Sequence, residues 1–356
     1  MVEDKCPKEN GIKLNCMKTT ERKTKKKPIK LILKNHQSIG DVCMLAYALK
    51  ALHENYPDRF VTGVDTPCNA IFEGNPYVTD LNIEDPSVKV IDMDYPTIHQ
   101  SNQRPYHFVN AFVKDLETKL AYLSIKLEPT EWSGAIYITE DEQGWYSQVH
   151  EILGYDPPYI CLNCGTKWDY LAKAWDHSRW QEIINRFPEV TFVQIGAKEH
   201  NHPTMEGKNL INLIGKTDLR QLIRLIWHSW GVITPISAPM HLAYAIPPHP
   251  RYNRKSRACI VIAGGREPNH WQAAANQQFI HTCGMLDCSD EGGCWKSRIK
   301  PLYLEKNDEK DESLCIYPVE LSGQWIGRCM DMISADEVCL LIKKYMDNLD
   351  YKEEKP

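Results

Sequence analysis

Residues 29–57 have the sequence IKLILKNHQSIGDVCMLAYALKALHENYP. Residues 29–35 are rich in branched apolar side chains, which is typical of a buried strand. The apolar residues that follow recur at helical spacing, namely Val42, Leu45, Ala46, Leu49 and Leu52. The segment therefore predicts a strand, a tight loop at residues 39–41, and a helix. Ligands of parallel sheets bind outside the carboxyl ends of the strands, so Asp41 stands where a functional residue is expected, although an ordinary helix cap explains it equally well.

The same alternation continues to the end of the first half. Strands are expected at 59–66, 88–95 and 134–139, with a helix at 111–123. A helix over 144–155 is expected to end at Gly154, and Pro157-Pro158 marks the expected domain boundary. The pattern predicts a parallel α/β sheet.

A second series of strands begins after the prolines. Strands are expected at 159–164, at 191–196, from residue 231, and at 259–265, where the second sheet should end. The C-terminal stretch 334–349 predicts a helix with Ser334 and Glu337 as its capping box.

Two loops of this second half are candidates for binding an anion. Lys167 and Lys173 lie in or just after the loop that follows strand 159–164, and ordinary surface lysines are the alternative. The helix expected to start near Met240 and His241 would offer free N–H groups and its positive dipole end to a diphosphate, unless His241 is simply a core histidine.

The sequence Gly215-Lys216-Thr217 resembles part of a phosphate-binding Walker loop. That motif requires a glycine at position 210, which is a leucine here, so the assignment is rejected. Thr217 is instead expected at the start of a helix.

Length and charge restrict the function classes. The 356 residues suggest about two domains, and a net charge of -5 gives no broad basic field for nucleic acid. The sequence shows neither an apolar membrane segment nor a signal peptide, which predicts a cytoplasmic protein with no membrane span. Residues 1–28 end in the basic run ERKTKKKP, and a solvated arm is favoured over a surface that contacts a membrane or an acidic partner.

Five of the 13 cysteines lie between residues 283 and 329. Four of them have the spacing Cys288-x5-Cys294-x20-Cys315-x13-Cys329, with Gly292-Gly293 between the first two. Four thiolates from two loops suit a closed zinc or iron site. Scattered buried thiols and two disulfides are the alternatives, and a reducing compartment disfavours disulfides.

Two groups of motifs resemble known families. SIGDVCMLAYALKALHENYP with GNPYVTDL, and GVITPISAPMHLAYAI after LIGKTDLRQLIRLI, resemble the ADP-heptose glycosyltransferases of lipopolysaccharide assembly, in glycosyltransferase family 9. CSDEGGCWKSRIKPL, CIYPVEL and CMDMI resemble the bacterial autotransporter heptosyltransferases. The resemblance extends from about residue 29 to about residue 345.

The resemblance implies an α/β fold of the GT-B type, with two Rossmann-like domains that face a cleft. A four-cysteine metal-binding segment and a closing helix would follow them. The implied ranges are 1–28 for the basic N-terminal arm, 29–156 for the acceptor domain, 157–280 for the donor-binding domain, 281–332 for the cysteine-rich segment and 333–350 for the helix.

The resemblance also implies roles for particular residues. Asp41 would be the general base, and Cys288, Cys294, Cys315 and Cys329 would hold one iron ion, with zinc as the alternative. The residues that would bind the donor are Gly165, Thr166, Lys167, Lys173, Thr217, Ser237, Met240 and His241. The sequence departs from the family pattern at Ile236, where many members have an acidic residue, and at Thr166, where a second glycine is usual.

The implied reaction is an inverting transfer of heptose from ADP-heptose to serine hydroxyls of a bacterial autotransporter or adhesin. The implied assembly is a large homo-oligomer. The alternatives are another nucleotide-sugar glycosyltransferase of this fold, including a lipopolysaccharide heptosyltransferase, and an oligomeric scaffold without catalysis.

Overall fold

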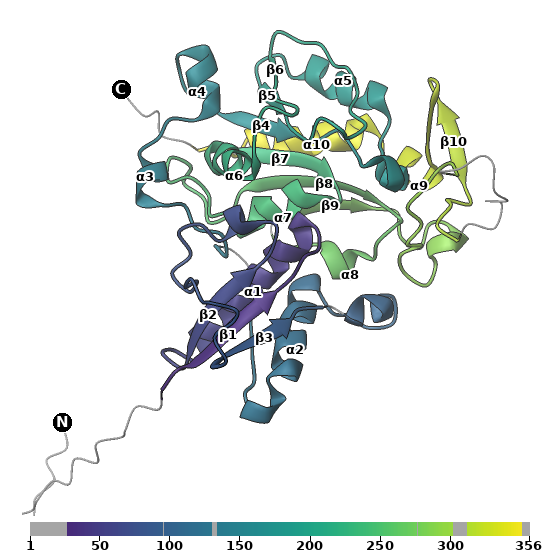
Figure 1. Ribbon diagram of the computed structural model, residues 1–356. Coiled ribbons are helices and arrows are strands. Elements are labelled where there is room, and N and C mark those ends of the chain that lie inside the picture. Colours follow the sequence, from purple (N-terminus) through teal and green to yellow (C-terminus); the bar gives the residue numbers. More distant parts are fainter. Residues whose placement is uncertain (1–26, 95, 130–133, 276, 302–311, 351–356) are drawn as a thin grey trace, which may run out of the picture.

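The chain forms two parallel sheets, a cysteine-rich segment and a closing helix (Figure 1). A computed structural model describes residues 27–94, 96–129, 134–275, 277–301 and 312–350. All but the last two residues of the predicted N-terminal arm lie outside the described residues. No helix among the described residues is long and apolar enough to cross a membrane.

The first sheet has three parallel strands in the order β2-β1-β3. Its strands are β1 (Ile29–Lys34), β2 (Phe60–Asp65) and β3 (Val88–Asp92). The longer helices of this half are α1 (Ile39–Asn55) and α2 (Phe108–Lys119). The short ones are η1 (Asn69–Ile71), η2 (Pro96–Gln100), η3 (Ala121–Leu123), α3 (Glu140–Gln143) and α4 (Gln148–Leu153). The predicted strand and helix at residues 29–57 are present. The loop between them is residues 35–38 and not 39–41 as predicted, because α1 already begins at Ile39 with Ser38 as its N-cap. Gly154 ends α4, as expected, and has a left-handed backbone.

The prediction of a strand at 134–139 is wrong. Ala135 and Ile136 are fully buried, and the Ile136 N–H donates to the carbonyl oxygen of Ala245 at 3.0 Å, in the other half of the molecule. The apolar pattern of this stretch therefore reflects burial between the two halves and not membership of the first sheet.

The second sheet has six parallel strands in the order β6-β5-β4-β7-β8-β9. Its strands are β4 (Tyr159–Leu162), β5 (Thr191–Gln194), β6 (Leu210–Asn212), β7 (Gly231–Pro235), β8 (Ala258–Gly264) and β9 (Gln277–His281). Its helices are η4 (Trp168–Lys173), α5 (His177–Arg186), α6 (Leu219–His228), α7 (Ala238–Ala245) and α8 (Asn269–Gln272). Counted along the chain from β4, the spatial order is 3-2-1-4-5-6, the order of a Rossmann sheet.

Two strands of this sheet escaped prediction. The strand at 259–265 does not end the sheet, because β9 follows it, and β6 forms the opposite edge. β6 has three residues, and β9, QQFIH, is half-buried along its length. Short edge strands with few apolar side chains give little periodic signal.

The C-terminal part closes over the second sheet. It contains η5 (Asp287–Ser289), the hairpin of β10 (Pro318–Leu321) and β11 (Gln324–Gly327), α9 (Arg328–Asp331) and α10 (Ala335–Met346). Ser334 and Glu337 form the predicted capping box of α10. Helix α10 packs on α5 and β8, and Val338 and Ile342 are fully buried there.

The two halves are joined by a shared apolar core. Helix α1 packs against α2 of its own half and lies beside α7 of the other half (Figure 1), and its residues 41–52 are all buried. The Tyr47 hydroxyl donates to the Tyr244 carbonyl oxygen at 3.3 Å across this contact. Each sheet lies in one of the two ranges predicted as domains, apart from the last residue of β9, and their independence as domains stays a prediction.

Candidate functional site

The order of the second sheet reverses between β4 and β7. Loops that leave the carboxyl ends of two such strands diverge to opposite faces and leave a crevice, which is the usual ligand site of this architecture. Asn163, directly after β4, links the two loops here: its side-chain amide donates to the Ser237 hydroxyl at 2.9 Å and to the Thr234 hydroxyl at 3.2 Å. Ser237 thus lies at the crevice, at the position directly before α7.

Gly165 and Thr166 continue the β4 loop into the crevice. A side chain at Gly165 would lie 2.3 Å from the imidazole of His202, so only glycine fits beneath this ring. Thr166 is 6% exposed, and within the described part of the chain its hydroxyl has no hydrogen-bond partner. Buried hydroxyls are nearly always paired, so an unpaired one at a crevice suggests a missing ligand.

The two candidate lysines lie in different surroundings. Lys167 is exposed at the start of η4. The side chain of Lys173, at the end of η4, is 17% exposed, and its ammonium forms an ion pair with Glu267 at 2.7 Å. Burial lowers the pKa of Lys173, and Glu267 partly opposes this shift. Lys173 is therefore a built part of the site and not a surface lysine.

Asp41 and His241 bring the two halves together at the site. A side chain on Gly40 would lie 2.9 Å from the His241 ring. Asp41 is 8% exposed and interacts electrostatically with Lys173. One carboxylate oxygen of Asp41 also accepts the Ser38 N–H at 3.1 Å, which is the helix-cap interaction. A carboxylate has room for several hydrogen bonds, so capping leaves the base role open.

The start of α7 offers fewer donors than predicted. Pro239 has no N–H, and the Met240 N–H donates to the Ser237 carbonyl oxygen at 3.1 Å. The Met240 side chain is fully buried. His241 is 5% exposed, its Nδ1 lies 3.1 Å from the Tyr244 hydroxyl, and burial lowers its pKa to about 4. His241 is accordingly neutral near pH 7.

Thr217 does not lie at the crevice between β4 and β7. The residue that caps α6 is Asp218, which accepts the Gln221 N–H at 2.8 Å, so the helix begins one residue later than expected. The loop that carries Thr217 follows β6, which β5 separates from β4 by about 10 Å across the sheet. The topology does not group Thr217 with the other candidates.

Glu267 is the main residue that sequence reasoning missed. It lies in the loop after β8, is 3% exposed, and pairs with both Lys173 and Arg266. Burial alone would raise the pKa of Glu267, but Lys173 and Arg266 lower it to about 2. The signal was present in Arg266-Glu267, two charged residues at the carboxyl end of a buried strand.

The cysteine thiols lie near one another. Cys315 and Cys329 sulfurs would both lie within 4 Å of a side chain placed on Gly327. Burial, together with repulsion from Cys294, raises the pKa of Cys288 and of Cys329 to about 11, although a hydrogen bond from the Gly265 backbone partly opposes the shift at Cys329. Across the ranges described, however, no three His, Cys, Asp or Glu residues are arranged to hold a metal ion.

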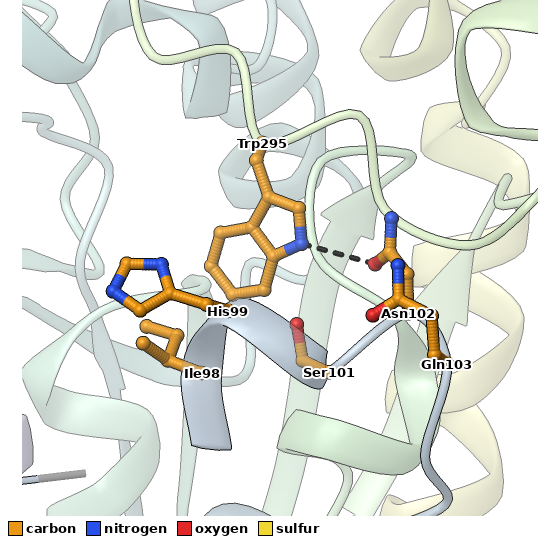
Figure 2. Close-up of a pocket in the computed structure, with 6 residues that line it drawn as sticks. All are labelled: Ile98, His99, Ser101, Asn102, Gln103 and Trp295. Carbon is orange, nitrogen blue, oxygen red and sulfur yellow. Dashed lines mark hydrogen bonds between the residues drawn. The ribbon is translucent and has the colours of Figure 1, made fainter. Parts of the chain in front are cut away.

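A cavity of about 340 Å³ opens between the first half and the cysteine-rich segment (Figure 2). It is lined by Ile98, His99, Ser101, Asn102, Gln103 and Trp295. Figure 2 shows the Trp295 indole, whose Nε1–H donates to the Asn102 side-chain oxygen at 3.0 Å. Asn102 also exchanges two hydrogen bonds with the backbone of Gly293, so the first half and the segment are fixed to each other here.

Comparison with known proteins adds to this geometry. Residues 109–248 match the family model for glycosyltransferase family 9 (heptosyltransferase). No curated protein matches the sequence.

Several solved structures have a similar fold. E. coli ADP-heptose lipopolysaccharide heptosyltransferase II is 13% identical, with 90% of this chain and 99% of that chain covered and a TM-score of 0.54. A family 9 glycosyltransferase of Veillonella parvula DSM 2008 is 14% identical (90% and 97% covered, TM-score 0.58). The iron-containing dodecameric glycosyltransferase TibC of enterotoxigenic E. coli H10407 is 16% identical (91% and 77% covered, TM-score 0.53). At these identities the likeness establishes the α/β fold, with its parallel sheets.

Proposed function

We propose that this chain, a transferase that carries a glycosyltransferase family 9 domain, transfers heptose from ADP-heptose to a hydroxyl group of a protein. One observation carries the proposal: Asp41, Lys173 and His241 converge from both halves beside the β4–β7 crevice. The structural neighbour TibC is known in complex with ADP-D-β-D-heptose, which supports this choice of donor.

The proposed reaction is a single inverting displacement. The acceptor oxygen attacks the anomeric carbon while its proton passes to the Asp41 carboxylate, a step in which a positioned base contributes about 10²–10⁴-fold. The bond from the anomeric carbon to the ADP oxygen breaks, and its electron pair leaves on the β-phosphate. Lys173, the Thr166 hydroxyl and the start of α7 would stabilise that charge.

The cavity beside Trp295 supports an uncharged acceptor. None of its lining residues is Asp, Glu, Lys or Arg, and it adjoins the loop after β3, on the same edge of the first sheet as Asp41. A phosphorylated lipopolysaccharide core would call for cations at this place. Serine on an autotransporter or adhesin suits the lining better.

The four-cysteine site remains part of the proposal. An iron or zinc ion suits the chemistry of four thiols that interact with one another, those of Cys288, Cys294, Cys315 and Cys329. Among the described residues, however, no three of these thiols are arranged to hold an ion. A closed four-thiolate site leaves no open position, so the ion would stabilise the segment and take no part in transfer. TibC is an iron-containing dodecamer, which supports both the ion and a homo-oligomer. A cytoplasmic location stays a prediction.

Intact-mass analysis tests the proposal. The purified chain is incubated with ADP-heptose and an autotransporter fragment, and the acceptor mass is measured. A heptose-sized increase is expected. An increase only with another nucleotide sugar would indicate a different donor, an increase only with a lipopolysaccharide core would indicate that acceptor, and no increase with any of them would indicate a scaffold.

A further inference from the structure

Glu267 lies where the charges of the site meet, and the reaction above gives it no role. Its carboxylate has three partners: Lys173 at 2.7 Å, the Arg266 guanidinium and the side-chain amide of Gln272. Because a buried charge must be paired and hydrogen-bonded, three donors fix this carboxylate in one position. Lys173, which pairs with it, is fixed as well.

We propose that Glu267 is a positioning residue of the donor site, which holds the Lys173 ammonium beside Asp41 and His241, where the diphosphate of the donor binds. The inference rests on the proposed function, since it assigns the ligand of Lys173. Glu267 acts through Lys173 and touches neither the acceptor nor the sugar.

The balance of charge supports this role. Lys173 and Arg266 bring two positive charges to a buried place, and the Tyr170 ring lies 5.4 Å from the first and 5.2 Å from the second. With Glu267 between them, the three side chains of Lys173, Arg266 and Glu267 together keep one net positive charge for an anionic ligand. Without Glu267 the two cations would repel each other where water screens little, and Lys173 would move away or lose its proton.

The cysteine-rich segment holds Glu267 in place. The backbone N–H of Trp295 donates to the Arg266 carbonyl oxygen at 2.8 Å. A side chain on Gly293 would lie 2.5 Å from that oxygen and 2.8 Å from the Cα of Glu267, so the segment packs directly on this backbone. Asn102 binds Gly293 from the first half. The fold of the segment thus determines the position of a donor-site charge.

Calorimetric titration with ADP tests the inference on the full chain. Glu267→Gln keeps the shape of the side chain and removes its charge, so ADP affinity at pH 7 should fall by at least about tenfold. Lys173→Met should lose a similar factor. If Glu267 acts through Lys173, the double variant should lose no more than Lys173→Met alone.

The pH dependence of ADP affinity distinguishes a positioning role of Glu267 from a role in stability alone. The groups that face Lys173 are Asp41 of α1, Tyr170 of η4, His241 of α7, and Arg266 and Glu267 after β8. Burial lowers the Lys173 pKa and Glu267 opposes this, so Glu267→Gln should lower that pKa further. The loss of ADP affinity at alkaline pH should then begin at a lower pH than in the wild type.

The controls keep the outcomes distinct. Glu189→Gln makes the same change at an exposed glutamate and should bind ADP as the wild type does. If Glu267→Gln does not fold, Gln272→Ala removes one of the donors that orient the carboxylate and should weaken ADP binding severalfold. The inference would be overturned by unchanged ADP affinity in whichever of Glu267→Gln and Gln272→Ala folds. It would also be overturned if the fold-loss of ADP affinity in the double variant equalled the product of the two single losses. A wild-type chain that binds no ADP would instead refute the proposed function.

Discussion

Asp41 and Glu267 are two buried carboxylates, of which only the first could be predicted as a site residue from the sequence. Asp41 follows a strand and begins a helix, so it was predictable, and the structure gives it a capping bond together with a place beside Lys173. Glu267 was not predicted, because its significance depends on Lys173, which is 94 residues earlier in the chain and meets it only in the folded sheet. Single residues could be found from strand ends, but their ion pairs could not.

The surroundings of the histidines were likewise not predictable from the sequence. His241 was equally compatible with a core position and with a site position, and the structure gives it both properties: it is buried, and it contacts Gly40 from the other half. The ring of His202 fills the space above Gly165. Glycine at 165 is therefore required by the size of a neighbouring ring, which no local pattern reveals.

At the scale of elements, the cysteine-rich segment connects three parts of the molecule. It binds the loop after β3 through Asn102, covers the loop after β8, and leads into α9 and α10. Its hairpin turns at Ser322-Gly323, where both residues have a positive φ of 49° and 80°, as tight two-residue hairpin turns require. A segment with so few apolar residues gains stability from its contacts and, in our account, from a metal ion.

Elemental analysis tests this account of the segment. The purified chain should contain about one equivalent of iron or zinc, because four soft thiolates saturate such an ion. Cys294→Ser should lose it. Cys283→Ser is the matched control, since Cys283 lies in the same segment but outside the proposed ligand set, and it should keep the metal. A wild-type chain with less than about half an equivalent, or equal loss in both variants, would contradict the site.

The longest elements were the most predictable ones. The strand and helix at 29–57 and the capped helix α10 have strong periodicity, and they are present. The edge strands β6 and β9 were missed because they are short or half-buried, and 134–139 was misassigned because it is buried between the halves. Burial by a partner element far along the chain imitates the pattern of a strand.

At the scale of the whole molecule, the two halves are more closely joined than a cleft between separate domains suggests. Apolar residues from both halves form one core, and Arg220 of α6 binds Glu142 and the Tyr137 carbonyl oxygen in the first half. The candidate site lies at the edge of this contact, where Gly40 meets His241. Catalysis in our account therefore depends on the two halves keeping their mutual position.

Buried histidines make the stability of the molecule sensitive to acid. Burial lowers the pKa of His107 to about 3, of His228 to about 2, and of His241 and His249 to about 4. The unfolded chain binds these protons below about pH 6.5 and the folded chain does not, so stability is lost as the pH falls from about 6.5 toward 4.

Denaturant unfolding at pH 7, 6 and 5 measures this loss. Each buried histidine can contribute up to about 1.4 kcal/mol per pH unit in this window. His228→Gln should make the free energy of unfolding depend less steeply on pH, whereas His36→Gln, at an exposed position, should not. Equal slopes in the wild type and His228→Gln would refute this explanation.

The central claim is that Asp41, whose carboxylate lies near Lys173 and His241, is the general base of the transfer. The most direct measurement is the rate of heptose transfer by Asp41→Asn, since asparagine keeps the shape of the side chain and also caps helices. We predict that kcat falls by about 10²–10⁴-fold while ADP affinity stays near that of the wild type, and that Asp80→Asn, at an exposed site in the same half, transfers normally. Transfer by Asp41→Asn at the wild-type rate would contradict the account.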